Sequence, residues 1–344
     1  MQMSSQRLRI LDGLRGICAL TVAIHHCLGV FNHTSPLEHG YLAVDVFFIL
    51  SGFVIALTYE QRLVSGWPLL LFMRARAFRL LPTFWLGVLL NAFVFLSFPL
   101  PDADGVVLST SVALVTVLGT ALMIPQMTSP DRYMFPTLTV AWSLLVEEIV
   151  NVSYGSLLFR VRTRWLIVLV ALSWGVLAVS GVPWFLGYKF CDLWIAILRG
   201  FGGFLTGVVI CRLYNSPLFD RLPAMNPTAL LATWIAVAAL PINIPPAIDA
   251  FIVTGYAPLL IALLIRSDNM APTWYKPLGA MSYPLYVTHW TIVRVAIATP
   301  AFAEPNPLLG VGLVLSCVFV AWILFRLTAP KRLRGMRQAV QPSR

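Results

Sequence analysis

The first sixty residues of the chain place ionisable side chains inside two long apolar runs. Arg15, His25 and His26 lie in RLRILDGLRGICALTVAIHHCLGVF, and Asp45 lies in GYLAVDVFFILSGFVIAL. A charged side chain at membrane depth costs about 2.5–3.5 kcal/mol on insertion scales, so such residues usually mark a protein-lined or water-filled site. This part of the chain is therefore a candidate for chemistry.

Arg15 and His26 are spaced to share one face of a helix. Eleven residues at about 100° per residue bring both side chains to nearly the same face, about 16 Å apart along the axis. His25 is rotated by about 100° from His26, so the two rings cannot point into one small site. One or both histidines could also simply hydrogen-bond inside a bundle. Adjacent histidines lack the i, i+4 spacing of a helical metal site, so we predict no bound metal.

A basic cluster precedes a later apolar run. FMRARAFRLLPTFW carries Arg74, Arg76 and Arg79 immediately before a span led by Pro82. Such arginines often serve only as cytoplasmic topology anchors. Guanidinium groups also bind phosphate in a bidentate manner, so the same cluster could hold a phosphate-bearing ligand.

Two more polar groups lie within apolar runs. WSLLVEEIVN places Glu147 and Glu148 about two turns inside a predicted span, and SYPLYVTHW carries Tyr286 and His289. A carboxylate beside an imidazole orients a general base and stabilises its protonated form. For His289, packing and hydrogen bonding between helices is an equally good interpretation.

The composition indicates that lipid surrounds these elements. Of the 344 residues, 59% are hydrophobic and only 11% are charged, whereas about 25% are charged in soluble domains. The net charge of +10 comes from Lys and Arg in short clusters between apolar runs, which is the pattern of cytoplasmic loops. We therefore predict an all-α polytopic membrane protein that does not bind nucleic acid. The five cysteines are scattered without C-x-x-C spacing, so we expect neither disulfides nor a zinc site.

Apolar segments of about the length needed to cross a bilayer occur eleven times in the sequence. They are Ile10–Val30, Tyr41–Tyr59, Leu80–Leu100, Val106–Pro125, Val140–Phe159, Trp165–Gly181, Leu193–Cys211, Thr228–Leu240, Phe251–Ile265, Gly279–Ala298 and Leu308–Leu327.

The basic clusters can all be cytoplasmic only if one of these segments does not cross. We predict that Val106–Pro125 is re-entrant or lies on the surface, which leaves ten crossings with both termini in the cytoplasm. Residues 1–330 then form one transmembrane domain, and residues 331–344 form a basic cytoplasmic tail.

Five sequence blocks resemble the integral-membrane acyltransferase-3 family, which contains bacterial O-antigen and exopolysaccharide O-acetyltransferases. The blocks LDGLRGICALTVAIHH, GYLAVDVFFILSGFVI, RARAFRLLP, WSLLVEE and SYPLYVTHW occur in the family's order and near its spacing. The family pattern of an arginine, ten residues and a histidine selects Arg15 and His26. Where relatives often continue E-x-Q-F-Y, this chain reads Glu148-Ile149-Val150-Asn151.

The resemblance implies transfer of an acyl group, commonly acetyl, from a cytoplasmic acyl-CoA to a hydroxyl of a sugar or other acceptor. It implies a multi-pass protein of the bacterial inner membrane without a tightly bound cofactor. His26 would be catalytic, and Arg15, Arg76 and Arg79 would help to bind the CoA donor. Glu147 matches the carboxylate of the W-S-L-x-x-E motif.

In the simplest hypothesis His26 removes the hydroxyl proton as the oxygen attacks the thioester, and Glu147 or Asp45 fixes the tautomer of His26. We assign Trp142, Ser143, Tyr286 and His289 to substrate binding. A two-step route through an acyl-enzyme stays open. A secondary transporter or a flippase of a lipid-linked glycan would also carry buried charges.

Overall fold

The computed structural model describes residues 8–32, 35–98, 101–102, 104–126, 132–241, 245–299 and 306–328. Helices dominate these residues, which form no β-strand beyond two isolated bridges. The prediction of an all-α fold is confirmed. The predicted tail, residues 331–344, lies outside the described residues.

The described residues form a series of α-helices along the chain. They are α1 (Arg9–Asn32), α2 (Ala43–Val64), α3 (Leu69–Ser97), α4 (Thr110–Ala121), α5 (Ala141–Ser156), α6 (Thr163–Ser180), α7 (Leu193–Leu213), α8 (Pro217–Asp220), α9 (Pro227–Ala238), α10 (Pro246–Phe251), α11 (Ala257–Arg266), α12 (Tyr275–Ile297) and α13 (Pro307–Thr328). A π-helical turn, Ile252–Tyr256, joins α10 to α11.

Seven helical segments among the described residues are long and apolar enough to cross a membrane. They contain α1, α2, α3, α6, α7, the α10–α11 pair and α13. The set supports a multi-pass membrane protein. It does not contain α5, α9 or α12, so the count of ten crossings and the placement of both termini in the cytoplasm stay predictions.

Every predicted apolar segment coincides with a helix, but α3 begins earlier than expected. It starts at Leu69, so Arg76 and Arg79 lie within the helix, and Pro82 is an interior residue. The helix therefore begins before the predicted apolar segment, and the placement of the arginines at the cytoplasmic membrane surface stays a prediction. Proline removes one backbone hydrogen bond but is tolerated in membrane helices, where neighbouring groups satisfy the freed carbonyl.

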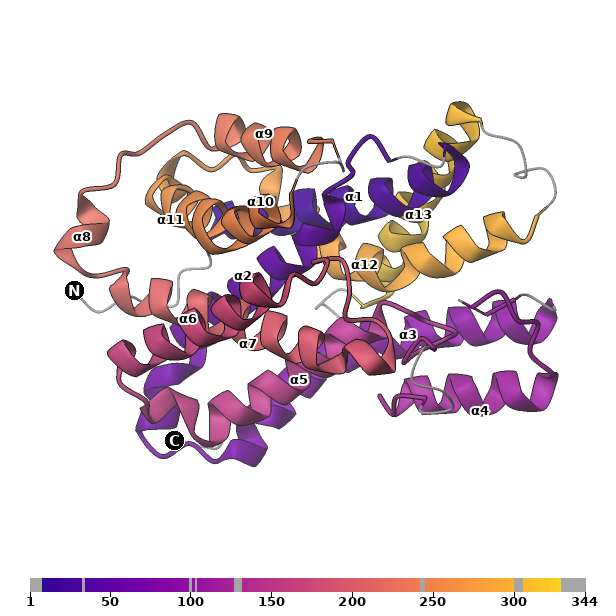
Figure 1. The fold of residues 1–344 in the computed structure, drawn as a ribbon, viewed down its shortest axis with the longest axis horizontal. Coiled ribbons are helices and arrows are strands. Elements are labelled where there is room, and N and C mark those ends of the chain that lie inside the picture. Colours follow the sequence, from indigo (N-terminus) through magenta and orange to yellow (C-terminus); the bar gives the residue numbers. More distant parts are fainter. Residues whose placement is uncertain are drawn as a thin grey trace.

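Helix α4 is the segment predicted not to cross. Its 12 residues span about 18 Å, which is shorter than the hydrocarbon core of about 30 Å. It lies beside α3 (Figure 1), and the Trp85 indole of α3 donates to the carbonyl of Ala121 at the end of α4, at 3.1 Å. This geometry suits a segment that enters and returns on one side.

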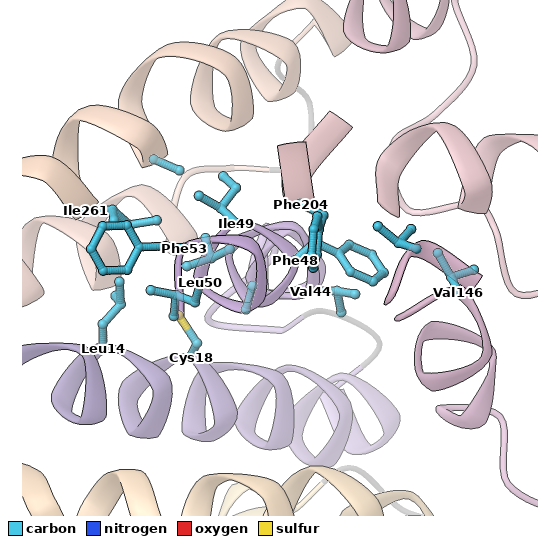
Figure 2. Close-up of a cluster of buried hydrophobic side chains, with 14 of the residues drawn as sticks. Leu14, Cys18, Val44, Phe48, Ile49, Leu50, Phe53, Val146, Phe204 and Ile261 are labelled. Atoms are coloured by element: carbon cyan, nitrogen blue, oxygen red, sulfur yellow. The ribbon is translucent and has the colours of Figure 1, made fainter. Parts of the chain in front are cut away.

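Helix α2 lies at the centre of the bundle. Figure 2 shows it end-on, surrounded by buried side chains from α1, α5, α7 and α11, among them Leu14, Val146, Phe204 and Ile261. Lipid solvates such side chains as well as protein does, so close packing and hydrogen bonds hold membrane helices together. The positions of small residues therefore decide which helices meet.

Glycines bring α2 and α7 into backbone contact. A Cβ added at Gly207 would lie 1.9 Å from the carbonyl oxygen of Ile49, and one added at Gly52 would lie 1.9 Å from that of Phe204. The same arrangement joins α1 to α12, since a Cβ at Gly279 would lie 2.5 Å from the Cα of Asp12. Both crossings depend on residues without side chains.

A buried ion pair holds the same α2–α7 crossing. Arg199 donates from Nε to Asp45 Oδ1 at 2.9 Å and from Nη2 to Asp45 Oδ2 at 2.7 Å. A third bond runs from Arg199 Nη1 to the carbonyl of Leu186 at 2.6 Å, and both charged side chains are at most 1% exposed. This bidentate geometry is the strongest that a carboxylate makes with a protein cation.

Asp45 is thus engaged by Arg199 and not by His26. The prediction that Asp45 could fix the His26 tautomer was wrong, because both of its carboxylate oxygens accept from Arg199 and His26 Nδ1 is bonded to His289. Sequence reasoning missed Arg199 as well. Its signal was a lone arginine inside the apolar run IAILRGFGGF.

Gly207→Ala should destabilise the bundle by about 1–3 kcal/mol, because the methyl group forces α2 and α7 apart. Thermal unfolding of the detergent-purified protein would measure this loss. Gly175→Ala on α6 is the matched control, since a Cβ there meets nothing within 4 Å. Equal melting temperatures for the two variants would contradict the packing argument.

Arg199→Met should cost about 3–5 kcal/mol, because it leaves the buried Asp45 carboxylate unpaired. The double variant Asp45→Asn with Arg199→Met removes both charges and should regain at least half of that loss in the same thermal assay. A double variant less stable than Arg199→Met alone would show that the pair is not the source of the effect.

Candidate active site

Two histidines from distant parts of the chain meet between α1 and α12. His26 Nδ1 lies 3.0 Å from His289 Nε2, and the two rings are 11° from parallel with centroids 5.2 Å apart. His289 Nδ1 lies 3.1 Å from the carbonyl oxygen of Leu285, one turn earlier in α12. His289 is fully buried, whereas His26 is partly exposed.

The hydrogen bonds determine which nitrogen atoms carry protons. The Leu285 carbonyl can only accept, so His289 Nδ1 carries its proton and donates. Nε2 of a neutral His289 is then an acceptor, so His26 donates to it from Nδ1. In neutral His26 the remaining nitrogen, Nε2, carries the lone pair and is free to act as a base.

His289 therefore occupies the position that we expected for a carboxylate. Glu147 instead accepts from Ser51 Oγ at 2.8 Å and from Arg76 Nη2 at 2.6 Å. The prediction that Glu147 could fix the His26 tautomer was wrong. The sequence could not show this, because the two histidines are 263 positions apart and several other polar residues lie within the apolar runs between them.

His25 turns away from this pair, as its rotation on the helix predicts. Its Nδ1 donates to the carbonyl of Leu37 at 2.8 Å. A Cβ on Gly40 would lie 2.7 Å from the Cβ of His25, so the chain before α2 passes directly over this residue. His25 therefore attaches α1 to the segment that leads into α2.

The predicted arginines come together around a cavity of about 100 Å³. Arg15 from α1 and Arg76 and Arg79 from α3 line it, together with Glu147 from α5. Arg76 is 4% exposed and is held by Glu147, whereas Arg79 is exposed. Three guanidinium groups against one carboxylate give this arginine cavity a positive charge, which suits phosphate groups.

Ser143 and Tyr286 line the same arginine cavity. Ser143 Oγ donates to the carbonyl of Val140 at 3.0 Å, so the Tyr286 hydroxyl, 2.6 Å away, donates to Ser143 Oγ. The Tyr286 ring also lies 6.0 Å from the ring of His289. Tyr286 therefore separates the arginine cavity from the histidine pair.

Trp142 lies elsewhere. The Arg199 guanidinium sits 5.4 Å from its ring centroid, and Trp142 is not among the described residues that line the arginine cavity. Its geometry supports the Asp45–Arg199 ion pair. The assignment of Trp142 to substrate binding has no support from this arrangement.

Another histidine near the end of the bundle is not available for catalysis. His39 Nδ1 pairs with Asp249 Oδ1 at 2.8 Å, and Nε2 lies 3.2 Å from the carbonyl of Pro241. Burial lowers the pKa of His39, but the bonds to Asp249 and Pro241 outweigh that effect and raise the pKa overall. With both nitrogens bonded, this side chain has a structural role.

Comparisons with known proteins identify the family of the chain. The sequence profile of the acyltransferase-3 family, an acyltransferase domain, matches residues 8–326. A protein of Rhizobium radiobacter, named protein 2 in picA locus, is 30% identical over 187 residues, which cover 52% of this chain and 97% of that protein. No solved structure is similar enough to match.

The family match favours acyl transfer over the transporter alternative. It spans both histidines, the arginine cavity and every described helix apart from the C-terminal end of α13. The chain therefore belongs to the acyltransferase-3 family and is a multi-pass membrane acyltransferase.

Proposed function

We propose that the protein transfers an acyl group, acetyl in the simplest case, from cytoplasmic acyl-CoA to a hydroxyl of a sugar in a cell-surface or exported glycan. The proposed location is the bacterial inner membrane. The observation that carries this proposal is the hydrogen-bond relay from the Leu285 carbonyl through His289 to His26, which leaves His26 Nε2 free as a base.

The arginine cavity supports acyl-CoA as the donor. Acyl-CoA carries several phosphate groups, and Arg15, Arg76 and Arg79 offer guanidinium groups at one site. The Glu147 carboxylate accepts from Arg76 and fixes the direction of that guanidinium group. A thioester seated beside Tyr286 would then lie one aromatic ring away from the histidine pair.

The reaction needs one base that later acts as an acid. His26 Nε2 takes the proton of the acceptor hydroxyl as its oxygen attacks the thioester carbonyl carbon. The tetrahedral intermediate collapses with cleavage of the carbon–sulfur bond, and the CoA thiolate takes the proton from His26. The products are the acyl ester and free CoA. His289 accepts from His26 Nδ1 throughout and so holds the ring in place.

His26→Ala should lower kcat for acyl transfer by about 10²–10⁴-fold, because it removes the general base. The assay follows release of free CoA and acylation of surface glycan by the purified protein in lipid nanodiscs. His25→Asn is the neighbouring control, since it keeps a donor near the Leu37 carbonyl, and it should stay within about threefold of wild type. Unchanged transfer in His26→Ala would refute the assignment.

Single-turnover reactions with labelled acetyl-CoA distinguish the direct route from the two-step route. A labelled protein that forms before any product would favour an acyl-enzyme.

His289→Leu should lower kcat by about 10²-fold or more without changing KM for acyl-CoA, because His26 loses the acceptor that selects its tautomer. His289→Gln places a carbonyl oxygen near the former Nε2 and should restore much of that loss. Leucine and glutamine fill similar space, so a residue that only packed would give similar rates for both variants. Equal rates would therefore assign His289 to packing.

A further inference from the structure

Arg294 anchors a loop across one end of α12. Its guanidinium donates to the carbonyls of Pro136, Thr137 and Pro101, and the side chain is 4% exposed. Arg294 follows His289 by five residues, which is about 7.5 Å along the helix axis. Five residues also rotate the side chain by about 140° around the helix, and the Arg294 guanidinium lies 4.8 Å from the ring centroid of Phe95 in α3. The loop backbone at residues 101 and 136–137 therefore lies farther along α12 than His289, on the side of α12 that faces α3.

This end of the bundle is opposite the arginine cavity. Helices α1 and α12 run in the same direction, because Gly13 meets Tyr275 near their starts and His26 meets His289 farther along. Arg15 lies in the first half of α1. A ligand near Arg294 would therefore approach His26 from the side away from Arg15.

A second cavity, of about 280 Å³, lies beside this loop. We call it the α4 cavity, because α4 forms one wall. Its polar lining comprises Asp102, Ser111, Thr116, Gln126 and Arg132. Its apolar lining includes Val112 and Pro136.

Asp102 is the buried charge of the α4 cavity. The residue is 4% exposed, and its Oδ1 accepts from the backbone N–H groups of Asp104 and Val106, each at 2.9 Å. Its Oδ2 accepts no hydrogen bond from the described residues and lies 3.7 Å from Arg132 Nη2. A buried carboxylate oxygen without a hydrogen-bond donor is unfavourable, and few buried polar groups in folded proteins lack a partner.

The lining selects a ligand that both donates and accepts hydrogen bonds. The Asp102 oxygen needs a donor, whereas Arg132 and the Gln126 amide can donate to oxygen atoms. The buried Asp102 carboxylate among the described lining residues disfavours an anionic ligand. Vicinal hydroxyl groups meet these requirements, and the C–H face of a sugar ring can pack on Val112 and Pro136.

We propose that the α4 cavity is the acceptor subsite and binds a sugar unit of the glycan. The subsite rests on the proposed function, since it deepens that function by naming where the acceptor binds. Donor and acceptor then occupy opposite ends of the bundle and meet at the histidine pair.

Asp102→Asn is a sharp test of the subsite. The asparagine oxygen can still accept from Asp104 and Val106, so the change replaces the Oδ2 oxygen, which lies 3.7 Å from Arg132 Nη2, by an amide donor. We expect KM for the acceptor to rise at least about tenfold, because the site is built to accept from a substrate hydroxyl. Binding of acetyl-CoA and the melting temperature should not change. The acceptor probe is unacetylated surface glycan extracted from source cells that lack the gene.

Asp104→Asn is the matched control. Asp104 Oδ2 lies 3.5 Å from Arg132 Nε, but Asp104 does not line the α4 cavity. Its KM for the same glycan should stay within about threefold of wild type. Equal KM values for wild type and Asp102→Asn would overturn the proposal.

A binding measurement keeps the subsite testable apart from transfer. Ser111→Cys, in a background with Cys191→Ser, places a thiol on the α4 wall, and the glycan should slow its labelling by maleimide. Protection without any acyl transfer would support the subsite and refute the proposed function. Transfer without protection would refute the subsite, as would protection by lipid vesicles alone.

Discussion

The direct backbone contact between α1 and α12 is the constraint on which the site depends. Gly279 lies against the backbone of Asp12, and any Cβ there would overlap it. Only this close approach lets the rings of His26 and His289 come within 3.0 Å of each other from two separate helices. The geometry of the histidine pair therefore depends on Gly279, a residue without a side chain that lies more than two turns from His289 along α12.

The buried carboxylates differ in what their arginine partners contact. Both carboxylate oxygens of Asp45 accept from Arg199. Near the ends of α2 and α7, Arg212 Nε donates to Glu60 Oε1 at 2.9 Å. Lipid does not solvate an unpaired charge, so such pairs stabilise one particular helix arrangement. Glu147 differs, because its partner Arg76 also lines the arginine cavity. One ion pair thus serves both the fold and the arginine cavity.

Local patterns predicted most of the helices and the correct face of α1. Apolar length marks a membrane helix whatever its neighbours are, and the 100° rotation per residue separates His26 from His25 without knowledge of any other helix. The start of α3 was missed because Arg74, Arg76 and Pro82 signal a helix boundary in isolation. In the structure these three residues lie inside α3, and Arg76 is held there by Glu147 from α5.

The sequence by itself determined that this protein is an all-α membrane protein of the acyltransferase-3 type with reactive side chains on its first helix. Periodicity, hydropathy and motif order are properties of short segments, so they survive without a fold. Only the tertiary structure decided which partner each reactive group has: His289 for His26, Arg199 for Asp45 and Arg76 for Glu147. Those partners lie 71 to 263 residues apart, and hydrogen bonds depend on distances in space, which spacing along a chain does not encode.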